Sequence, residues 1–367
     1  MELALQGHPI HTRSLGIELR AEGGRELAAC GEILDLRKLG VLPMTSDLQT
    51  AGFIHHMRIA LRAERATRRI GSIALEQPAV AFEASAATGG ESCRDPSPRL
   101  QALVGERLDA GFPKRLSERL GGPRGCSHVL TLFQLMASAL PHALDHEEAQ
   151  VRAAGASAWT RRAGELVFKR SLVLDGLRPG PAEIGVCAQL NDFHTRPFDL
   201  DPGPIERLER QRELRIASRV GVAKIELLEL RAALRERLGS DLAAGGWQDL
   251  DAEVAPLVGR TVTGGLAREL FARFGSRPER RLLLDALLNL GPAVVQCTPA
   301  LVDFLIGAGV GPDRGPGEAS SAPPGARELS GAILMGGFPD SCFMWRRDGA
   351  LSRGRRSVEE RLEGGRR

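Results

Sequence analysis

Alternation of apolar and polar side chains is the clearest signal in the first part of the chain. In residues 53–62, His55 and Met57 fall with other apolar side chains on one face of an extended strand, and His56 falls on the other. The turn signal Gly23-Gly24 predicts a β-hairpin. The strands predicted in this way are residues 15–20, 26–36, 53–62 and 70–75. They form an antiparallel meander whose apolar face needs cover.

Helical spacing replaces this alternation after residue 96. Ser97 followed by Pro98 predicts the start of a helix, because proline is favoured at the first helical position. Apolar side chains then keep helical spacing to Gly111, and two more helices are expected over residues 113–120 and 127–144. The last of these is apolar almost all round, which is typical of a helix buried on most sides.

The second half of the chain repeats the first. Arg13-Ser14-Leu15 recurs 157 residues later as Arg170-Ser171-Leu172. Other pairs at this offset are Cys30 with Cys187, Asp35 with Asp192, and Arg58-Ile59-Ala60 with Arg215-Ile216-Ala217. With three residues lost, Leu103-Val104-Gly105 returns as Leu257-Val258-Gly259, and Gly111, Leu116, Arg119 and Gly121 fall on Gly265, Leu270, Arg273 and Gly275. Constant offsets over such long spans indicate an internal duplication.

These patterns predict an α+β protein. We expect a tandem duplication of an antiparallel β-meander of about four strands, each followed by three helices, packed as an internal pseudo-dimer. The expected divisions are a first repeat at 13–150 that carries the cysteine and histidine residues considered below, a degenerate second repeat at 169–311, a flexible linker at 312–327, a C-terminal segment at 328–350 that packs back on the repeats, and a charged tail at 351–367.

Composition narrows the classes of function. The 367 residues are 43% hydrophobic and 26% charged, which leaves room for two domains. The net charge of +3 gives no footprint for nucleic acid or for a membrane surface. Tyrosine is absent, so no tyrosine acts as acid, base or nucleophile.

The ends and the cysteines point to the cytoplasm. Residues 1–11 lack the basic and apolar regions of a signal peptide. Residues 291–311 contain Pro292, Pro299 and Asp303 and fit a buried helix better than a membrane span. The six cysteines show no close pairing, so reduced thiols are expected.

A glycine-rich turn at 121–125 delivers Cys126 and His128 to the first turn of the third helix. The positive end of the helix dipole is expected to favour the thiolate of Cys126, with His128 sharing a metal ion or acting as its proton partner. Cys93 lies in the loop before the first helix, and His55 lies on the strand face that the helices cover. Cys93, Cys126 and His128 fit a zinc or iron site, and Cys126, His128 and His55 are the candidate catalytic residues.

Asp35 would add a carboxylate to this set. Alternatively Asp35 and Asp192, near the ends of strands, cap turns or face a cleft between the repeats. In the second repeat, Arg212 occupies the position that corresponds to His55. This asymmetry indicates that the unshared polar residues carry chemistry, and the competing interpretation is that the second repeat has drifted.

The cysteines have a competing interpretation of their own. Cys93 and Cys126 have no cysteine counterpart in the second repeat, whereas the shared pair Cys30 and Cys187 is interpreted as core. Isolated buried cysteines usually act as small hydrophobic residues, so Cys93 and Cys126 also fit a purely structural role.

The segment Gly125-Cys126-Ser127-His128 is the most distinctive short motif. Further short motifs of the chain are Ile54-His55-His56-Met57, Leu103-Val104-Gly105, Ala110-Gly111-Phe112, Ser341-Cys342-Phe343-Met344-Trp345 and Asp348-Gly349. Together they resemble a bacterial family known as domain of unknown function 2889 (DUF2889), over most of the chain. The resemblance implies a cytoplasmic bacterial protein with Cys126 and His128 as its most recognisable pair, and it brings no activity. The layout of sheet, helices and cysteines is also similar to that of iron–sulfur scaffold proteins.

Three functions agree with these patterns. The first is a metal- or thiol-dependent enzyme acting on a small apolar organic molecule, in which an open metal position polarises a carbonyl or water. The second is a non-catalytic ligand-binding or metal-carrying protein. The third is a structural or interaction protein with its cysteines in the core. A small molecule is the expected partner, with no nucleic acid and no membrane, and the pattern sets neither the substrate nor the oligomeric state.

Overall fold

The protein is described by a computed structural model. It describes residues 5–301 and 337–354, apart from residues 24, 45–46, 157, 181, 199–202, 204–205, 240 and 242–244. The predicted linker at 312–327 lies outside the described residues.

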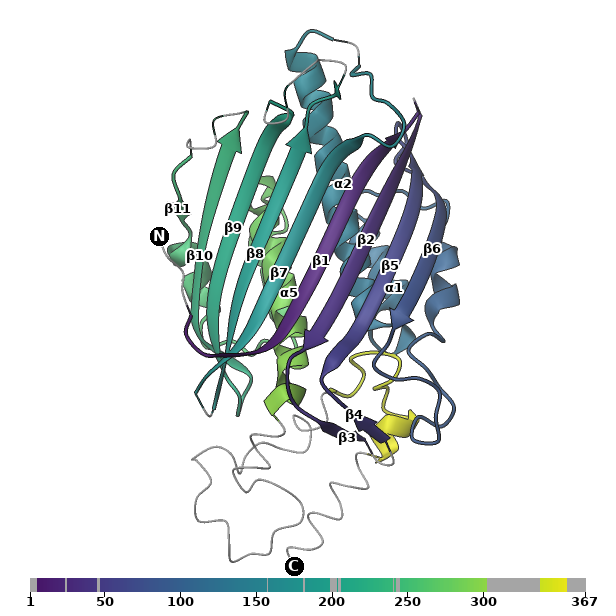
Figure 1. The fold of residues 1–367 in the computed structure, drawn as a ribbon, viewed down its shortest axis with the longest axis vertical. Helices are drawn as coiled ribbons and strands as arrows, with labels where there is room; N and C mark the ends of the chain where they lie inside the picture. Colours follow the sequence, from purple (N-terminus) through teal and green to yellow (C-terminus); the bar gives the residue numbers. More distant parts are fainter. Residues whose placement is uncertain are drawn as a thin grey trace, which may run out of the picture.

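A nine-stranded antiparallel sheet forms one layer of the fold (Figure 1). Its strands, in spatial order, are β11 (Gln248–Asp249), β10 (Glu226–Leu238), β9 (Leu208–Gly221), β8 (Glu183–Thr195), β7 (Leu166–Gly180), β1 (His8–Glu22), β2 (Glu26–Arg37), β5 (Gly52–Glu64) and β6 (Ile70–Ala79). A two-stranded ribbon of β3 (Leu42–Met44) and β4 (Asp47–Gln49) lies at one end. The predicted antiparallel meander is confirmed in both halves.

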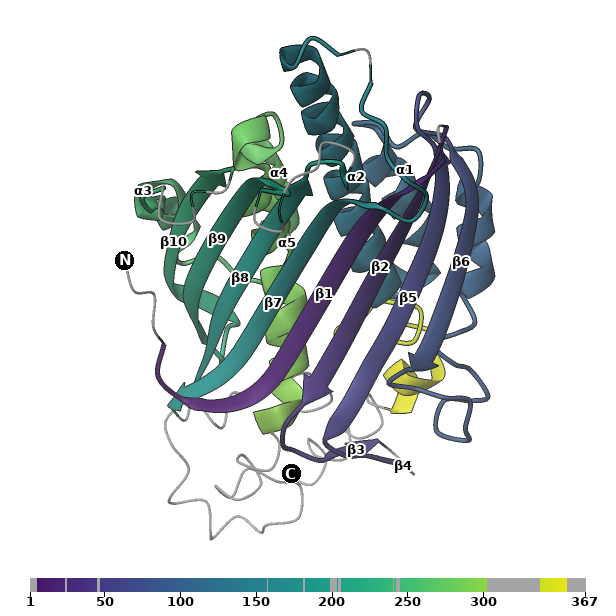
Figure 2. The same ribbon diagram turned by 45° about the horizontal axis from the view of Figure 1, so that its top comes forward.

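The helices cover a single face of this sheet, as Figures 1 and 2 show. They are α1 (Phe112–Leu120), α2 (Ser127–Ala153), α3 (Asp251–Val254), α4 (Leu266–Phe274) and α5 (Arg281–Cys297). Short 3-10 turns accompany them at Ser97–Leu103, Gly122–Arg124, Ala255–Leu257, Pro278–Arg280 and Thr298–Leu301. The predicted α+β class is therefore confirmed, although the segment that begins at Ser97 is a single seven-residue 3-10 helix.

The two predicted repeats meet along one pair of strands. β1 and β7 pair antiparallel, with Leu15 opposite Leu172, Arg13 opposite Leu174 and Ile17 opposite Arg170. Leu15 therefore lies opposite its own counterpart, Leu172, and residues on either side of Leu15 lie opposite each other's counterparts. A twofold relation between the halves requires this pattern. The duplication and the pseudo-dimer themselves stay predictions from the sequence.

The core fills the space between the sheet and its two longest helices. Leu132 and Met136 of α2 and Leu287 of α5 are almost completely buried there. Gly31 of β2 permits the close approach of α2, because a Cβ at this position would overlap the side chain of Met136. The apolar faces predicted from alternation and from helical spacing therefore meet in one core.

One helical stretch of the described chain, Pro278–Leu301, is long and apolar enough to cross a membrane. Most of it, 78% of the apolar window, is buried inside the fold, which is how the core helix of a soluble domain behaves. This agrees with the interpretation of the apolar segment as a buried helix, for its described residues up to 301.

Residues 337–354 pack on the first half, and they appear in yellow in Figures 1 and 2. Met344, Trp345 and Leu351 form a buried cluster with Cys93. Leu351 and Ser352, at the start of the predicted charged tail, are buried in a helix that reaches residue 354. Residues 355–367 lie outside the described residues.

Truncation of Leu172 tests the seam between the halves. Leu172 is fully buried, so Leu172→Ala should lower the free energy of unfolding by roughly 2–5 kcal/mol through lost burial and a residual cavity. Leu228→Ala on β10, whose side chain is 43% exposed, should change it by less than about 0.5 kcal/mol. Urea unfolding followed by circular dichroism measures both, and equal effects of the two substitutions would contradict this packing.

Candidate metal centre

Polar side chains occupy one end of the otherwise apolar inner face of the sheet. His11 and Arg13 lie on β1, Asp35 on β2 and His55 on β5, each in the inward position of the strand's alternation. Asp35 is paired in register with Arg13 on one side and with His55 on the other. Residues directly opposite each other in an antiparallel sheet have neighbouring side chains, so the ladder alone brings these groups together. The alternative of Asp35 as a turn cap is wrong, since its side chain is fully buried.

His128 reaches this cluster from the first turn of α2. The chain enters the helix through Gly125, where a Cβ would clash with the carbonyl oxygen of Leu120, so the turn before α2 requires glycine. Cys126 is the N-cap residue and His128 is the second residue of the helix. The glycine-rich turn predicted from the sequence therefore does place the imidazole of His128 over the sheet.

Three ligand atoms converge at the centre of the cluster. Asp35 Oδ2 lies 3.4 Å from His55 Nδ1 and 3.4 Å from His128 Nε2. All three atoms lie within 4.8 Å of one another, and all three residues are buried. The two imidazole rings stack at 3.6 Å between centroids. We call Asp35, His55 and His128 the triad.

The other oxygen of Asp35 faces cations. Asp35 Oδ1 lies 3.5 Å from an Arg13 guanidinium nitrogen and 3.4 Å from His11 Nε2. Burial works to raise the pKa of Asp35, but Arg13 and His55 outweigh it and hold this pKa well below its usual range. The carboxylate is therefore ionised at neutral pH.

The surrounding imidazoles are neutral. Burial lowers the pKa of His55. Burial, followed by the repulsion that a protonated His55 would exert, lowers the pKa of His128 well below its ordinary value. Burial also lowers the pKa of His11 to about 4. An ionised carboxylate and neutral imidazoles are the protonation states in which these side chains bind metal ions.

Few of these buried polar atoms are hydrogen-bonded within the described residues. Both oxygens of Asp35, Nδ1 of His55 and all three guanidinium nitrogens of Arg13 have no hydrogen-bond partner there. Their separations of 3.4–3.5 Å are longer than ordinary hydrogen bonds. Buried polar groups are usually satisfied, so this concentration calls for a specific explanation.

The second half shows the same strand positions closed by ordinary hydrogen bonds. Arg170 and Asp192, the predicted counterparts of Arg13 and Asp35, form a bidentate pair at 2.6 and 2.7 Å. Arg170 also donates to Asp285 of α5. An arginine and an aspartate at these positions can thus close on each other, and in the first half they do not.

Two neighbours contact His128 from opposite sides of its ring. Cys126 Sγ lies 3.9 Å from Nδ1, and the side-chain amide of Gln296 from α5 lies 3.2 Å from Nε2. Cys126 is therefore placed on the ring nitrogen that faces away from Asp35. The predicted ligand set of Cys93, Cys126 and His128 differs from the set that the described residues bring within reach of one ion, which is the triad.

A cavity of about 60 Å³ adjoins the triad. His55, His128 and Gln296 line it together with Cys93 and Cys126. The C-terminal segment closes another side, with Cys342, Phe343, Met344 and Trp345 in the wall. The backbone N–H of Phe343 donates to the carbonyl oxygen of Gly125 at 2.9 Å, which ties this segment to the turn that carries Cys126.

The thiols of Cys126 and Cys93 do not have the lowered pKa values that a thiolate requires. Burial raises the pKa of Cys126 to about 12, and this effect exceeds the opposite one of the backbone N–H groups of Val129 and His128. Burial also raises the pKa of Cys93 well above its ordinary value. The predicted thiolate is therefore wrong for these groups as they stand, because desolvation exceeds the effect of the helix terminus.

Cys30 and Cys187 are not core residues, in contrast to the sequence-based interpretation. Cys30 is exposed and Cys187 is half-buried. Both occupy outward positions in the alternation of their strands, next to inward residues such as Gly31 and Ala188.

The sequence-based choice of site residues was incomplete. His55, His128 and Cys126 do come together, and Cys93 lies in the cavity wall, whereas His11, Arg13 and Gln296 were not predicted. The inward alternation of β1 is the signal for the first two, and Gln296 has none, since it arrives from the other half of the chain.

A second histidine spacing is also present. His142 and His146 lie four residues apart on α2, a spacing typical of helical metal ligands that the sequence predictions above do not use. His146 is hydrogen-bonded to Glu209 and accepts from Arg210 at 3.3 Å. In the described part of the chain only the triad brings three such ligand atoms together.

The fold and its buried carboxylate–imidazole cluster define a two-layer α+β protein with a candidate metal centre. Residues 11–141 match the model of the family described as "Protein of unknown function (DUF2889)", so the resemblance to that family is confirmed over this part of the chain. The match includes the whole triad, whereas Gln296 and the C-terminal wall lie beyond it. Comparison with curated proteins gave no match, and comparison with solved structures gave none either.

Alkylation tests the state of the thiols. Under native conditions at neutral pH, iodoacetamide should modify exposed Cys30 at least roughly tenfold faster than Cys93 and Cys126, which are buried and protonated. Peptide mass spectrometry measures the rates, and the difference should vanish in denaturant. Labelling of Cys126 as fast as that of Cys30 in the native protein would contradict a buried, protonated thiol and support the thiolate predicted from the sequence.

Proposed function

We propose that this protein is a metal-dependent enzyme whose divalent ion is bound by Asp35, His55 and His128. The observation that carries the proposal is the convergence of three buried ligand atoms within 4.8 Å of one another. A tetrahedral ion with bonds of about 2.0–2.1 Å holds its ligand atoms roughly 3.3–3.4 Å apart. The distances from Asp35 Oδ2 to the ligand nitrogens of His55 and His128 are both 3.4 Å.

The donor set favours a catalytic centre over a structural one. Two imidazoles and one carboxylate with a further open position are typical of catalytic zinc and of non-haem ferrous iron, whereas structural zinc sites are closed by four protein ligands. Zinc and iron, the metals expected from the sequence, therefore remain the proposed ions, with oxygen and nitrogen ligands in place of the sulfur ligands.

The neighbours of the triad support ligation by one oxygen of Asp35. His11 and Arg13 face Oδ1 and leave Oδ2 directed at the two imidazoles. Cys126 lies at Nδ1 of His128, where a second group orients a ligating ring. Such outer contacts set the tautomer and the position of metal ligands.

The surroundings favour a resident ion used for chemistry. The triad is buried, which suits an ion that stays in place better than one that is handed to another protein. The adjoining cavity of about 60 Å³ admits a molecule of only a few atoms, and Phe82, Met344 and Trp345 give its wall an apolar character. A metal ion beside it would polarise a carbonyl or activate water on a small, largely apolar substrate.

Substitution of Asp35 tests the centre. Protein purified in the presence of zinc or, without oxygen, of ferrous iron should hold about one ion per chain, and Asp35→Asn should lose most of it because the only anionic ligand is gone. Elemental analysis by plasma mass spectrometry measures both metals.

Two controls isolate the effect of Asp35. Glu32→Gln changes an exposed carboxylate on the same strand and should leave the metal content intact. Asp192→Asn breaks the counterpart pair with Arg170 and should lower the free energy of unfolding by several kcal/mol, about 3 or more, while the folded protein keeps its metal. Metal retained by Asp35→Asn, or absent from the unsubstituted protein with either metal, would refute the proposal.

Gln296 is a candidate for a fourth, neutral ligand, and a five- or six-coordinate ion bound in this way would still keep an open position. Rotating its amide by half a turn puts Oε1 where Nε2 now lies, 3.2 Å from His128 Nε2, which is close to the 3.4 Å edges of the triad. Gln296→Leu should then weaken metal affinity roughly 10-fold or more, and Gln296→Glu should preserve or raise it. Competition with a chelator measures the affinities, and equal affinity of Gln296→Leu and the unsubstituted protein would show that Gln296 only hydrogen-bonds His128.

A further inference from the structure

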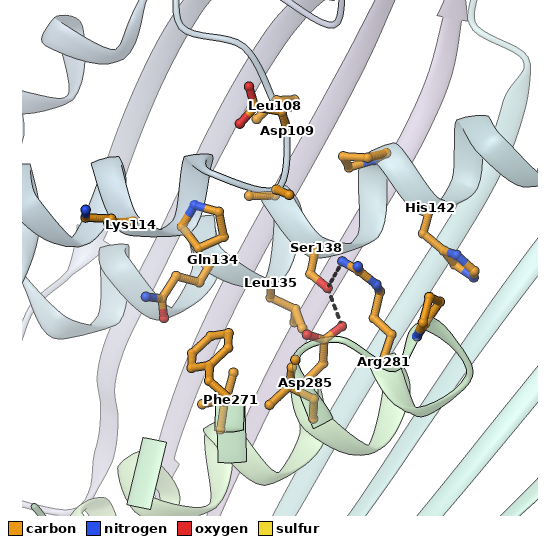
Figure 3. A pocket seen from close by; sticks show the side chains of 18 of the residues that line it. Leu108, Asp109, Lys114, Gln134, Leu135, Ser138, His142, Phe271, Arg281 and Asp285 are labelled. Carbon is orange, nitrogen blue, oxygen red and sulfur yellow. Dashed lines mark hydrogen bonds between the residues drawn. The ribbon is translucent and has the colours of Figure 1, made fainter. Parts of the chain in front are cut away.

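A second cavity lies between the helices of the two halves, away from the triad. It measures about 730 Å³, within the usual range for sites that bind small organic molecules. Figure 3 shows α2, with Gln134, Leu135 and Ser138, facing Phe271, Arg281 and Asp285 from the second half. We call this cavity the interhelical groove.

The groove is apolar along much of its wall and polar at one end. Leu135, Phe271, Leu284 and Leu288 line the apolar part, and the ring of Phe271 is 44% exposed. At the polar end, Ser138 donates to Asp285 at 2.7 Å, and Arg281 reaches Ser138 through a long contact of 3.4 Å (Figure 3). This division suits a ligand with an apolar body and a polar head.

The acidic groups of the groove have cationic partners. Asp285 accepts a hydrogen bond from buried Arg170, Asp145 pairs with Arg68, and Asp109 pairs with Arg115 at 3.1 Å. Arg170 also pairs with Asp192, so it is shared between two carboxylates, and the charge of Arg281 adds to the stabilisation of Asp285.

The cations of the groove are not all neutralised. Arg277 pairs with Glu253 at 3.0 Å and with Glu279 at 2.9 Å. Arg281, which is half-buried, interacts electrostatically with Asp285, but it and exposed Arg107 have no carboxylate within 4.0 Å among the residues that the structure describes. A half-buried guanidinium with a single long hydrogen bond to a hydroxyl keeps most of its donor capacity.

We propose that the interhelical groove binds an amphipathic organic acid, with its carboxylate on Arg281 and its apolar chain along Leu135, Leu284 and Phe271. Arginine is suited to this role because its planar donors match a carboxylate in a bidentate arrangement. His142 lies at the same end with Nε2 buried and without a hydrogen-bond partner among the described residues, so it offers a further polar contact to the head group.

Titration calorimetry with octanoate tests this site. Octanoate should bind the unsubstituted protein, whereas Arg281→Gln should weaken the affinity roughly 10-fold or more through loss of a charge-assisted hydrogen-bonded pair. Arg277→Gln removes a guanidinium from the same groove that is already ion-paired, and it should change the affinity by no more than about twofold. Octanol, with the same chain and no charge, should bind markedly less tightly than octanoate.

Three results would overturn the proposal. They are no binding of octanoate to the unsubstituted protein up to about 10 mM, equal affinity for octanol, and unchanged affinity in Arg281→Gln. If Arg281→Gln does not fold, the comparison of octanoate with octanol and the affinity of Arg281→Lys, which keeps the charge, still decide. Metal content is measured on the same samples, so a failure here is separate from a failure of the metal centre.

Discussion

The buried carboxylate of Asp35 is the charge around which the first half of the inner face is arranged. An ionised carboxylate removed from water is costly unless charges or hydrogen bonds compensate it. The strand register supplies that compensation, since it sets Arg13 on one side of Asp35 and His55 on the other. α2 then adds His128 from above the sheet. The first turn of α2 and the polar side chains of β1, β2 and β5 are therefore arranged around one buried charge.

The two halves carry different side chains at equivalent positions of their paired strands. In the second half Arg170 and Asp192 satisfy each other, Arg212 occupies the position that corresponds to His55, and α5 carries Leu282 as its second residue where α2 carries His128. An arginine and an aspartate thus occupy these positions in both halves but are hydrogen-bonded to each other only in the second, and His55 and His128 have no histidine counterpart there.

Local pattern was sufficient for most of the fold and for part of the site. Alternation located every long strand of the first half, because one face of the sheet is buried and the other is not. It also placed His55 inward with Met57, and the glycine-rich turn placed His128 at the start of a helix. These features depend on neighbours close in sequence, which is why the residues themselves reveal them.

The rest depends on contacts between distant segments. Nothing in the pattern of β1 shows that its free edge pairs with β7, nor that Gln296 arrives at His128 from 168 residues away. The state of Cys126 was misjudged because the effect of a helix terminus is visible in the sequence, whereas the desolvation that exceeds it comes from packing by the C-terminal segment and the sheet. Cys30 and Cys187 occupy equivalent positions in the two halves, but this equivalence does not show that they are buried, and Cys30 is exposed.

The pairing of β1 with β7 has a consequence for any chain that carries only one unit of this kind. β1 would then present a row of unsatisfied backbone groups along its whole length, and natural proteins avoid such exposed edges. Because the register is centred on Leu15 and its offset partner Leu172, the same edge is complementary to a second copy of itself in the antiparallel sense. If the halves are a duplicated unit, a single-unit chain is expected to associate in pairs through β1, whereas here β1 pairs with β7 within one molecule and without dependence on concentration.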